Sequence, residues 1–323
     1  MAHPAPQPHT PEPHGTQPHH HGHEHEHGHG QSHANDSHGS HGHRHPEGAD
    51  PQDGLAEMLD LDAELFAAHL ANLTERLAHL AGDGVTQVVD LGAGTGTGTF
   101  ALLERFPAAR VTAVDNSPVM LARLRASADA RGAGDRVHTL ETDAGTGLPG
   151  VTDADLVWAS ASLHHMDDPA TALAEIRAAL RPGGLLAVAE LDGLPHFLPE
   201  DVVPERPGLE VRCRTALDAL HAEQVPHLGA DWRVLLTAAG FTVEEEHTEV
   251  LELRAPFPAD AGRYAYLVLN RIRGTLDGRV DPVDLTALDA LLDGGPGDVR
   301  HRDDLVVRST RRTWTARRPA DRP

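Results

Sequence analysis

The sequence predicts a doubly wound α/β fold, in which a mostly parallel, seven-stranded sheet carries helices on both faces. Short apolar segments alternate with helical patterns between residues 84 and 192, an order that is typical of parallel sheets. Two longer segments near the end of the chain alternate between apolar and polar residues, as strands do. Aromatic residues make up only 3% of the chain, so Leu, Val and Ala must supply most of the core.

Seven segments have the length and the apolar content of strands. The predicted strands are 88–91, 111–115, 137–141, 155–159, 185–190, 241–253 and 306–316. Helices are predicted where apolar residues recur every three or four positions. They are 55–81 (one or two helices), 100–106, a helix that begins after Ser117-Pro118, 170–180, 209–222, 231–239, 259–274 and 283–292. Ser117 is the expected N-cap of the helix that follows it, with Pro118 in the first turn.

The helices outside the sheet are expected to form a lid over the ligand site. They are the N-terminal helices within 55–81 and the helical insert of the segment 193–318. Open α/β sheets bind ligands beyond the carboxyl ends of their strands, so additional helices at that edge would cover the ligand. Phe257, Tyr264 and Tyr266 would make the covered pocket apolar. The alternative is that these helices bury only one another or a partner subunit.

Residues 1–50 differ sharply from the rest of the chain. They contain almost no aliphatic side chains, and they hold 15 of the 25 histidines. Such a segment cannot bury enough apolar surface to offset the entropy of the chain, so we expect a disordered tail. Residues 51–323 are then one folded domain, with its ligand-binding core at 84–192.

Seven histidines are crowded into one stretch of this tail. His19, His20 and His21 are consecutive, and they are followed by His23, His25, His27 and His29, which alternate with Gly and Glu. Neutral imidazole is a good ligand for Ni, Zn, Co or Cu, so we expect the tail to bind such metals. Their spacing is not that of a structural zinc site, and adventitious binding by a solvated tail stays the alternative. A catalytic metal is not expected.

The composition excludes several functions. The net charge is −22, and all 27 basic residues are Arg, because the sequence contains no Lys. Walker-type nucleotide sites, pyridoxal Schiff bases and Tyr-x-x-x-Lys dehydrogenases therefore lose their key residue. The negative charge argues against binding to nucleic acid or to anionic membranes. The single cysteine, Cys213, cannot form an internal disulfide, and we expect it to be an inert thiol within a helix.

The sequence also predicts the location and the partners of the protein. No apolar run approaches the ~20 residues that cross a bilayer, and the N-terminus does not resemble a secretory signal. We therefore expect a cytoplasmic protein that acts on a small molecule and binds neither a membrane nor nucleic acid. A homodimer is compatible with the sequence, which leaves the oligomeric state open.

The strongest chemical signal follows the first predicted strand. Residues 88–96 read Val-Val-Asp-Leu-Gly-Ala-Gly-Thr-Gly, a strand that leads through a glycine-rich turn into a helix. Glycines allow a ligand to approach the backbone closely, and the helix N-terminus favours negative charge. A dinucleotide site requires G-x-G-x-x-G, and Thr97 stands where its third glycine should be.

Further signals follow the next three predicted strands. Asp115 ends the second strand, in the segment 115–121 (Asp-Asn-Ser-Pro-Val-Met-Leu). A carboxylate at this position can accept hydrogen bonds from both ribose hydroxyls of NAD or of S-adenosylmethionine. Asp143 and Ala144 follow the third strand, and Ser160 and His164-His165 follow the fourth.

In this order, the motifs resemble those of class I, seven-stranded S-adenosylmethionine-dependent methyltransferases that act on small molecules. The resemblance covers about residues 84–192 well and the last strand more loosely. It implies that S-adenosylmethionine is the cofactor, that Met120 flanks the adenine, that Asp143 binds the adenine amino group and that Ser160 lies beside the amino acid moiety. The cofactor-binding residues that it implies are Asp90, Gly92, Ala93, Gly94, Gly96, Asp115, Asn116, Met120, Asp143, Ala144 and Ser160.

The implied reaction is an in-line displacement that moves a methyl group to an O, N or C nucleophile. Alignment of the two reactants supplies much of the catalysis. Where the nucleophile must lose a proton, histidine is the natural base. The resemblance places His164 and His165 at the mouth of the pocket, where either is a candidate base or orienter of the substrate; the alternative is that both only pack the pocket wall. Glu190 and Asp192, at the end of the fifth strand, are further candidates.

Two other functions stay open at this point. An NAD-dependent oxidoreductase would use the same architecture, although the glycine spacing and the absence of Lys disfavour it. A metal-binding protein would use the His-rich tail, with the folded domain as its carrier.

Overall fold

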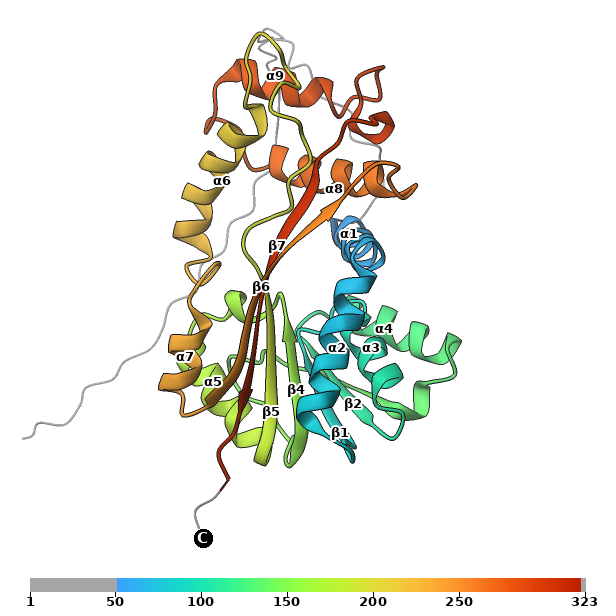
Figure 1. Ribbon diagram of the computed structural model, residues 1–323, viewed down its shortest axis with the longest axis vertical. Coiled ribbons are helices and arrows are strands. Elements are labelled where there is room, and N and C mark those ends of the chain that lie inside the picture. Colours follow the sequence, from blue (N-terminus) through green and yellow to red (C-terminus); the bar gives the residue numbers. More distant parts are fainter. Residues whose placement is uncertain (1–50, 321–323) are drawn as a thin grey trace, which may run out of the picture. The chain divides into compact units, whose positions relative to one another are not determined.

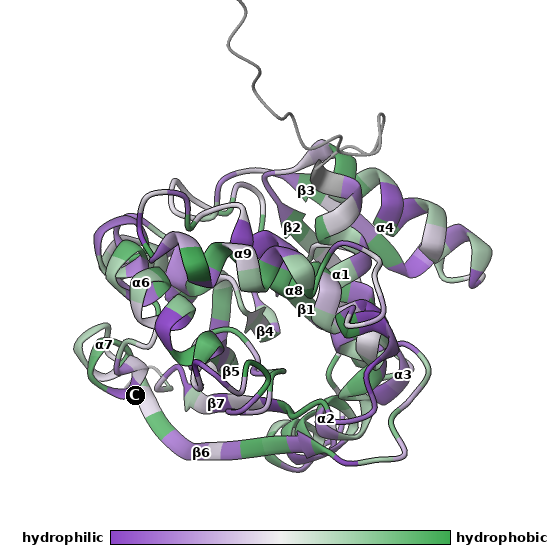
Figure 2. Cartoon of the chain, turned by 90° about the horizontal axis from the view of Figure 1, so that it is seen from above, coloured by the Kyte–Doolittle hydropathy of each residue, from purple (hydrophilic) through white to green (hydrophobic). Residues whose placement is uncertain are grey.

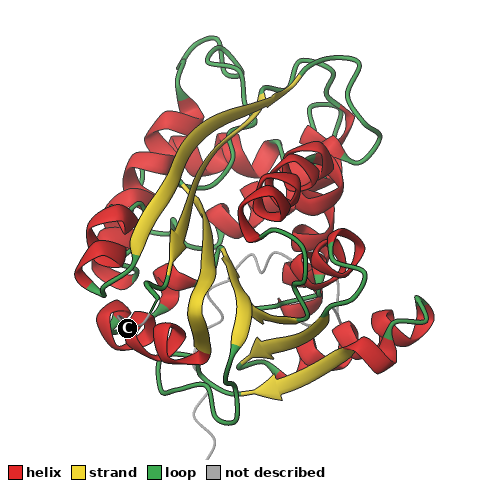
Figure 3. Ribbon diagram, turned by 60° about the horizontal axis from the view of Figure 1, so that its bottom comes forward, coloured by secondary structure: helices red, strands yellow, loops and turns green. Residues whose placement is uncertain are grey.

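Seven strands form one mixed sheet in the computed structural model, which describes residues 51–320. The strands are β1 (Gln87–Leu91), β2 (Arg110–Asp115), β3 (Val137–Glu141), β4 (Ala154–Ser160), β5 (Leu180–Leu191), β6 (Thr242–Leu253) and β7 (Val307–Arg317). Their order in the sheet is β3-β2-β1-β4-β5-β7-β6, and only the pairs of β7 are antiparallel (Figures 1 and 3). All seven predicted strands are thereby confirmed.

Every predicted helical segment is also helical. The helices are α1 (Pro51–Leu65), α2 (Ala67–Ala81), α3 (Thr97–Arg105), α4 (Pro118–Ala130), α5 (Pro169–Ala179), α6 (Leu209–Gln224), α7 (Trp232–Ala238), α8 (Ala261–Arg273) and α9 (Pro282–Ala290). Ser117 caps α4 as predicted, because its Oγ accepts a hydrogen bond from the Met120 amide at 3.3 Å, with Pro118 at the first position. Within the described residues, no helix is long and apolar enough to cross a membrane.

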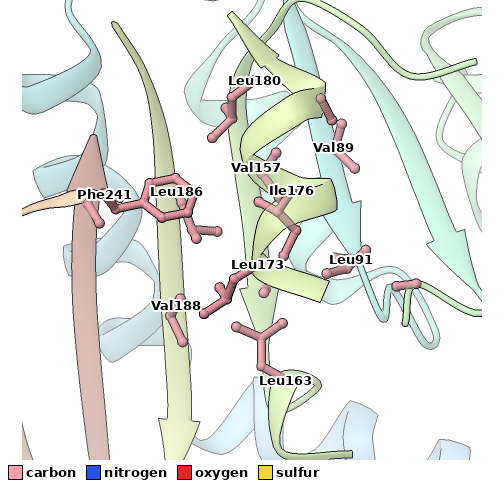
Figure 4. Close-up of a cluster of buried hydrophobic side chains, with 14 of the residues drawn as sticks. Val89, Leu91, Val157, Leu163, Leu173, Ile176, Leu180, Leu186, Val188 and Phe241 are labelled. Atoms are coloured by element: carbon pink, nitrogen blue, oxygen red, sulfur yellow. The ribbon is translucent and has the colours of Figure 1, made fainter. Parts of the chain in front are cut away.

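Helices cover both faces of the sheet. On one face, α2 and α3 bury Leu77 and Leu102 against Val88 and Leu156, and α4 lies beside them (Figure 1). On the other face, α5 and α7 pack on the alternate residues of the same strands. Figure 4 shows this second core, in which Leu173 and Ile176 of α5 lie against strand residues. Alternate residues of a strand point to opposite faces, so both sides of each central strand must be apolar, as the sequence provides.

The alternation of strand and helix is broken once, between β3 and β4. Residues 142–153 connect these strands without a helix. This segment contains Gly145, Gly147 and Gly150 together with Pro149, and glycine and proline are the poorest helix formers. Its own buried residues, Ala144 and Leu148, join the α5 core in place of a helix.

A further layer of helices lies beyond the carboxyl ends of the parallel strands. Seen from above, α6, α9, α8 and α1 form a row over that edge (Figure 2). They share a separate core, which includes Phe66, Phe197, Cys213 and Tyr264. The long strands β6 and β7 extend out of the sheet into this layer (Figures 1 and 3). The expectations for residues 1–50, disorder and metal binding, lie outside the described residues.

The strand order places a ligand site between β1 and β4. Chain connections run from β1 towards β2 and β3 on one side and from β4 towards β5 on the other. A crevice opens at the carboxyl end of a sheet where its connections diverge in this way. The glycine-rich turn between β1 and α3 lies at this point.

Candidate active site

The turn after β1 is closely packed against its surroundings. Gly92, with φ +70°, lies so close to the loop after β4 that a Cβ atom there would meet the Ser162 Cβ at 2.4 Å. The Ser162 hydroxyl donates a hydrogen bond to the Leu91 carbonyl at 2.9 Å. At Gly94, by contrast, a Cβ would meet only the Leu59 side chain, at 3.5 Å. The turn therefore requires glycine at position 92 for packing, whereas position 94 faces α1.

Two carboxylates flank this turn. Asp115, at the end of β2, accepts hydrogen bonds from the amides of Gly94 and Ser117, both at 2.8 Å, and so holds the turn in place. Asp90 is buried, and its Oδ2 accepts a hydrogen bond from the Thr99 hydroxyl at 2.6 Å. Burial raises the pKa of Asp90 to about 6, although the Thr99 hydrogen bonds work in the opposite direction.

A cavity of about 180 Å³ begins at this turn and runs under the helical layer. Its inner end is lined by Asp90, Gly92, Gly94, Thr97 and Ser160, from the β1 and β4 edges and the start of α3. Its outer end is lined by α1, α2, α8, β5 and β7. The apolar residues of the outer end include Met58, Leu70, Leu73, Leu194 and Val268. We call this outer end the acceptor chamber.

Polar residues of the acceptor chamber come from distant parts of the sequence. Tyr264 of α8 donates a hydrogen bond to the Asp62 carboxylate of α1, and Arg311 of β7 donates to the same oxygen at 2.6 Å. Burial and the charge of Asp62 raise the pKa of Tyr264 well above its usual value, so its hydroxyl stays protonated. The Arg311 Nε is buried without a hydrogen-bond partner among the described residues. His69 of α2 also lines the chamber.

Five of the predicted cofactor residues lie on the wall of the cavity. They are Asp90, Gly92, Ala93, Gly94 and Ser160. The other six, which were expected around the turn, the ribose and the adenine, lie outside that wall. They are Gly96, Asp115, Asn116, Met120, Asp143 and Ala144. Asp115 contacts the turn directly, whereas Asn116 and Asp143 are exposed beyond the ends of β2 and β3. Their roles towards a ligand stay predictions.

Neither of the two predicted catalytic histidines lines the cavity. His164 is buried, with its Nδ1 2.5 Å from Oε2 of Glu190, and His165 is exposed beside it. Glu190 does line the cavity, and its Oε1 accepts a hydrogen bond from the Leu163 amide at 3.0 Å. His164 thus reaches the cavity only through Glu190. Asp192, the other candidate at the end of β5, is exposed and lies off the wall.

Sequence reasoning missed three of the polar residues of the acceptor chamber. Asp62, His69 and Arg311 belong to no motif, and the docking of α1, α2 and β7 brings them together. The available signal was a polar side chain, His69, among the apolar residues Phe66, Leu70 and Leu73 of a helix. The expectation for Cys213 agrees with its position, since the thiol is buried and burial raises its pKa to about 11.

The residues present fit S-adenosylmethionine. The cofactor carries a sulfonium cation, and the cavity wall carries three carboxylates, those of Asp62, Asp90 and Glu190. Backbone groups of the glycine-rich turn are accessible at the inner end, where the amino acid moiety is expected. Among the described residues, no group of three or more His, Cys, Asp or Glu side chains could hold a metal ion.

Comparisons with known proteins agree with this fold. A family model described as a methyltransferase domain matches residues 89–186. The trans-aconitate 2-methyltransferase of Enterobacter sp. (strain 638) is 36% identical over 172 residues, which are 51% of this chain and 65% of that protein. The enzyme of the same name from Streptomyces avermitilis is 31% identical over 195 residues, 59% of this chain and 70% of that protein.

A solved structure is similar at a lower sequence identity. Phosphoethanolamine N-methyltransferase 2 of Haemonchus contortus, in complex with S-adenosyl-L-methionine, is 17% identical, with a TM-score of 0.46 over 83% of this chain and 57% of that one. The matches to the first three curated relatives span 42% to 65% of those proteins.

The switch-point cavity and the glycine-rich turn define a cofactor-binding enzyme domain of the doubly wound α/β class. These structural features and the similarity to the Streptomyces enzyme together identify the family. The chain belongs to the class I S-adenosylmethionine-dependent methyltransferases of the small-molecule type.

Proposed function

We propose that this protein transfers the methyl group of S-adenosylmethionine to a small molecule bound in the acceptor chamber. The observation that carries the proposal is the continuity of one cavity, from the glycine-rich turn to the chamber under α1, α2 and α8. A methyl donor at the turn and an acceptor in the chamber would share this one cavity. A shared cavity can hold the two reactants in line, which is the main requirement of an in-line displacement.

The chain's own residues supply the remaining functions. S-adenosylmethionine, when bound, supplies an activated methyl group and a leaving group. Asp115 holds the turn through the Gly94 amide, and Asp90 presents a buried carboxylate towards the cationic ligand. The helices α1 and α8, joined through Asp62 and Tyr264, form part of the chamber wall.

The experiment that tests the proposal is calorimetric titration of the full chain, in EDTA, with S-adenosylmethionine and separately with NAD. We expect micromolar binding of S-adenosylmethionine and none of NAD. Asp115→Ala should abolish binding, because the turn loses its anchor, whereas Asp135→Ala, at an exposed carboxyl beyond α4, should not. Binding of NAD alone would revive the oxidoreductase alternative and overturn the proposal.

The names of the relatives make trans-aconitate the first acceptor to assay. It is a tricarboxylate, and the wall carries Asp62, Asp90 and Glu190 against one guanidinium, that of Arg311. Since Asp62 already pairs with Arg311, we expect a poor fit for a trianion. A homodimer and a cytoplasmic location stay predictions from the sequence.

A second proposal concerns the histidines between His19 and His29, which lie outside the described residues. Their density supports binding of Ni, Zn, Co or Cu, independent of catalysis. Titration of the full chain with nickel, and assays before and after chelation, test it. Loss of methyl transfer after chelation of the metal would contradict the proposal that metal binding is independent of catalysis.

A further inference from the structure

His69 is a histidine placed on the wall of the acceptor chamber by α2. Its side chain is 11% exposed, and it lines the same cavity as Gly94, Thr97 and Ser160. Unlike His164, it therefore faces the space in which the acceptor would lie. A base must be within reach of the proton that it abstracts, so position is the first requirement.

Glu249 of β6 fixes the orientation of the His69 ring. Its Oε2 lies 2.7 Å from the His69 Nδ1, and its Oε1 accepts a hydrogen bond from Arg76 of α2 at 3.2 Å. Burial acts to raise the pKa of Glu249, but the hydrogen bonds and charges of His69 and Arg76 outweigh it and lower the pKa. An ionised carboxylate can only accept, so the His69 proton is assigned to Nδ1.

This tautomer leaves the lone pair on the other ring nitrogen, Nε2. None of the hydrogen bonds within the described part of the chain involves that atom. The charged groups that face the ring are Glu249 on β6, Arg76 on α2 and Arg311 on β7. Burial lowers the pKa of His69, Arg311 and Arg76 add to this effect, and Glu249 opposes it. The ring is therefore neutral at pH 7.

We propose that His69 is the general base of the methyl transfer, positioned by Glu249, and that the acceptor is an uncharged, largely apolar molecule with a phenolic or enolic hydroxyl. The proposal rests on the proposed function. The acceptor's O–H bond breaks and its proton passes to Nε2, while the oxygen forms a bond to the methyl carbon. The bond from that carbon to sulfur breaks, and its electron pair stays on sulfur. The imidazolium then releases the proton to solvent.

The chamber itself selects this class of acceptor. A carboxylate carries no proton at pH 7 and needs no base, and the acidic side chains Asp62, Asp90 and Glu190 repel it. A phenol, with a pKa of about 10 as in Tyr, keeps its proton and does need a base. Met58, Leu70, Leu73, Leu194 and Val268 offer the ring of such an acceptor an apolar surface.

The first arm of the test measures the His69 ring itself. Imidazole ¹⁵N spectra of the full chain, assigned with His69→Gln, should show a proton on Nδ1 and none on Nε2 at pH 7. Glu249→Gln should weaken that preference and lower the pKa of the ring, because the charge that raises it is gone. A proton on Nε2, or a doubly protonated ring at pH 7, would overturn the proposal.

The second arm measures methyl transfer from S-adenosylmethionine to three probes: 2-naphthol, catechol and trans-aconitate. We expect turnover of a phenol, with a rate that falls in acid as His69 is protonated, at a lower pH than for an ordinary histidine because the pKa of His69 is lowered. His69→Gln should lower kcat at least 100-fold, and Glu249→Gln about 10-fold with the acidic limb shifted to lower pH. His247→Gln is the control, because this exposed histidine of β6 also lies beside a carboxylate, with its Nε2 3.2 Å from Glu245 Oε2, but away from the cavity.

The outcomes separate this inference from the proposed function. Three outcomes contradict the inference when S-adenosylmethionine still binds. They are methylation of trans-aconitate alone, turnover of none of the three probes, and an unchanged rate in His69→Gln. If the unmodified chain does not bind S-adenosylmethionine, that result contradicts the proposed function instead. Should His69→Gln fail to fold, Glu249→Gln carries the test through its pH profile.

Discussion

Asp62 on α1 and Arg311 on β7 are 249 positions apart in the sequence, and an ion pair of 2.6 Å joins them in the wall of the acceptor chamber. Tyr264 of α8 donates a hydrogen bond to the same carboxylate oxygen. One side chain of the first helix thus ties together three elements of the chamber wall. The packing of these three elements around the chamber therefore depends on this carboxylate.

Asp62→Asn should therefore loosen the chamber. The variant leaves the half-buried Arg311 without its counter-charge, which costs about 1–3 kcal/mol of unfolding free energy. Urea denaturation measures this loss, and α1 should become more susceptible to proteolysis. Glu57→Gln is the matched control on the same helix, because its partner Arg263 is 41% exposed and such a pair is worth less than about 1 kcal/mol. Equal losses in the two variants would contradict the special role of Asp62.

Most of the fold could be predicted from the sequence because its helices and strands follow from local patterns of residues. The strands β1, β2 and β4 contain short apolar runs, and the glycine spacing of the turn at Gly92 is typical of one class of cofactor. The residues of the acceptor chamber could not be predicted in this way. Asp62, His69 and Arg311 meet because α1, α2 and β7 dock around one cavity, and no spacing in the sequence encodes that docking.

The prediction that His164 and His165 are catalytic followed from their place after β4, and the position was correct. What the sequence could not indicate is the direction of the side chains. Glu190, itself buried, lines the cavity and pairs with His164 at 2.5 Å, whereas His164 does not line it. A buried carboxylate needs such a partner, and this requirement is decided by packing rather than by the motif.

We expect His165→Asn to retain both folding and methyl transfer, because its side chain is exposed and lies off the cavity wall. His164→Asn should instead lower the stability by about 2–4 kcal/mol, because Glu190 loses its buried partner. Thermal unfolding and initial rates of both variants measure these effects. A His165→Asn variant that is stable but inactive would restore His165 as the catalytic base and displace His69.

The glycines at positions 92 and 94 should respond differently to alanine. Gly92→Ala forces a Cβ to 2.4 Å from the Ser162 Cβ, so the turn or the β4 loop must move, and we expect a loss of at least about 2 kcal/mol. Gly94→Ala meets only Leu59, at an ordinary 3.5 Å, and bears only the cost of its φ of +52°, about 1 kcal/mol. Chemical denaturation of the two variants gives the comparison. A larger loss at position 94 would show that the turn is held differently.

We expect the ionised carboxylate of Asp90 to lower the stability of the fold and to strengthen the binding of the cofactor. Its pKa is about 6 in the folded chain against 3.8 as the ordinary value, so ionisation of the buried carboxylate works against folding as the pH rises. Asp90→Asn removes this penalty. We expect a gain of about 1 kcal/mol at pH 4.5, where most of the carboxyl is protonated in the folded state, and of about 3 kcal/mol at pH 8. Asp83→Asn, at an exposed turn, should show no gain that grows with pH.

Asp90→Asn should also weaken the binding of S-adenosylmethionine. A cationic ligand favours the ionised carboxylate, so the affinity of the unmodified chain should rise with pH through about 6 and then level off. In Asp90→Asn, the affinity should be at least about 10-fold lower at pH 8, and its rise near pH 6 should be absent. Calorimetric titrations at pH 5, 6, 7 and 8 measure both effects. An affinity that keeps the same dependence on pH in the variant would mean that Asp90 does not face the cation, and its raised pKa would then be a property of the buried core alone.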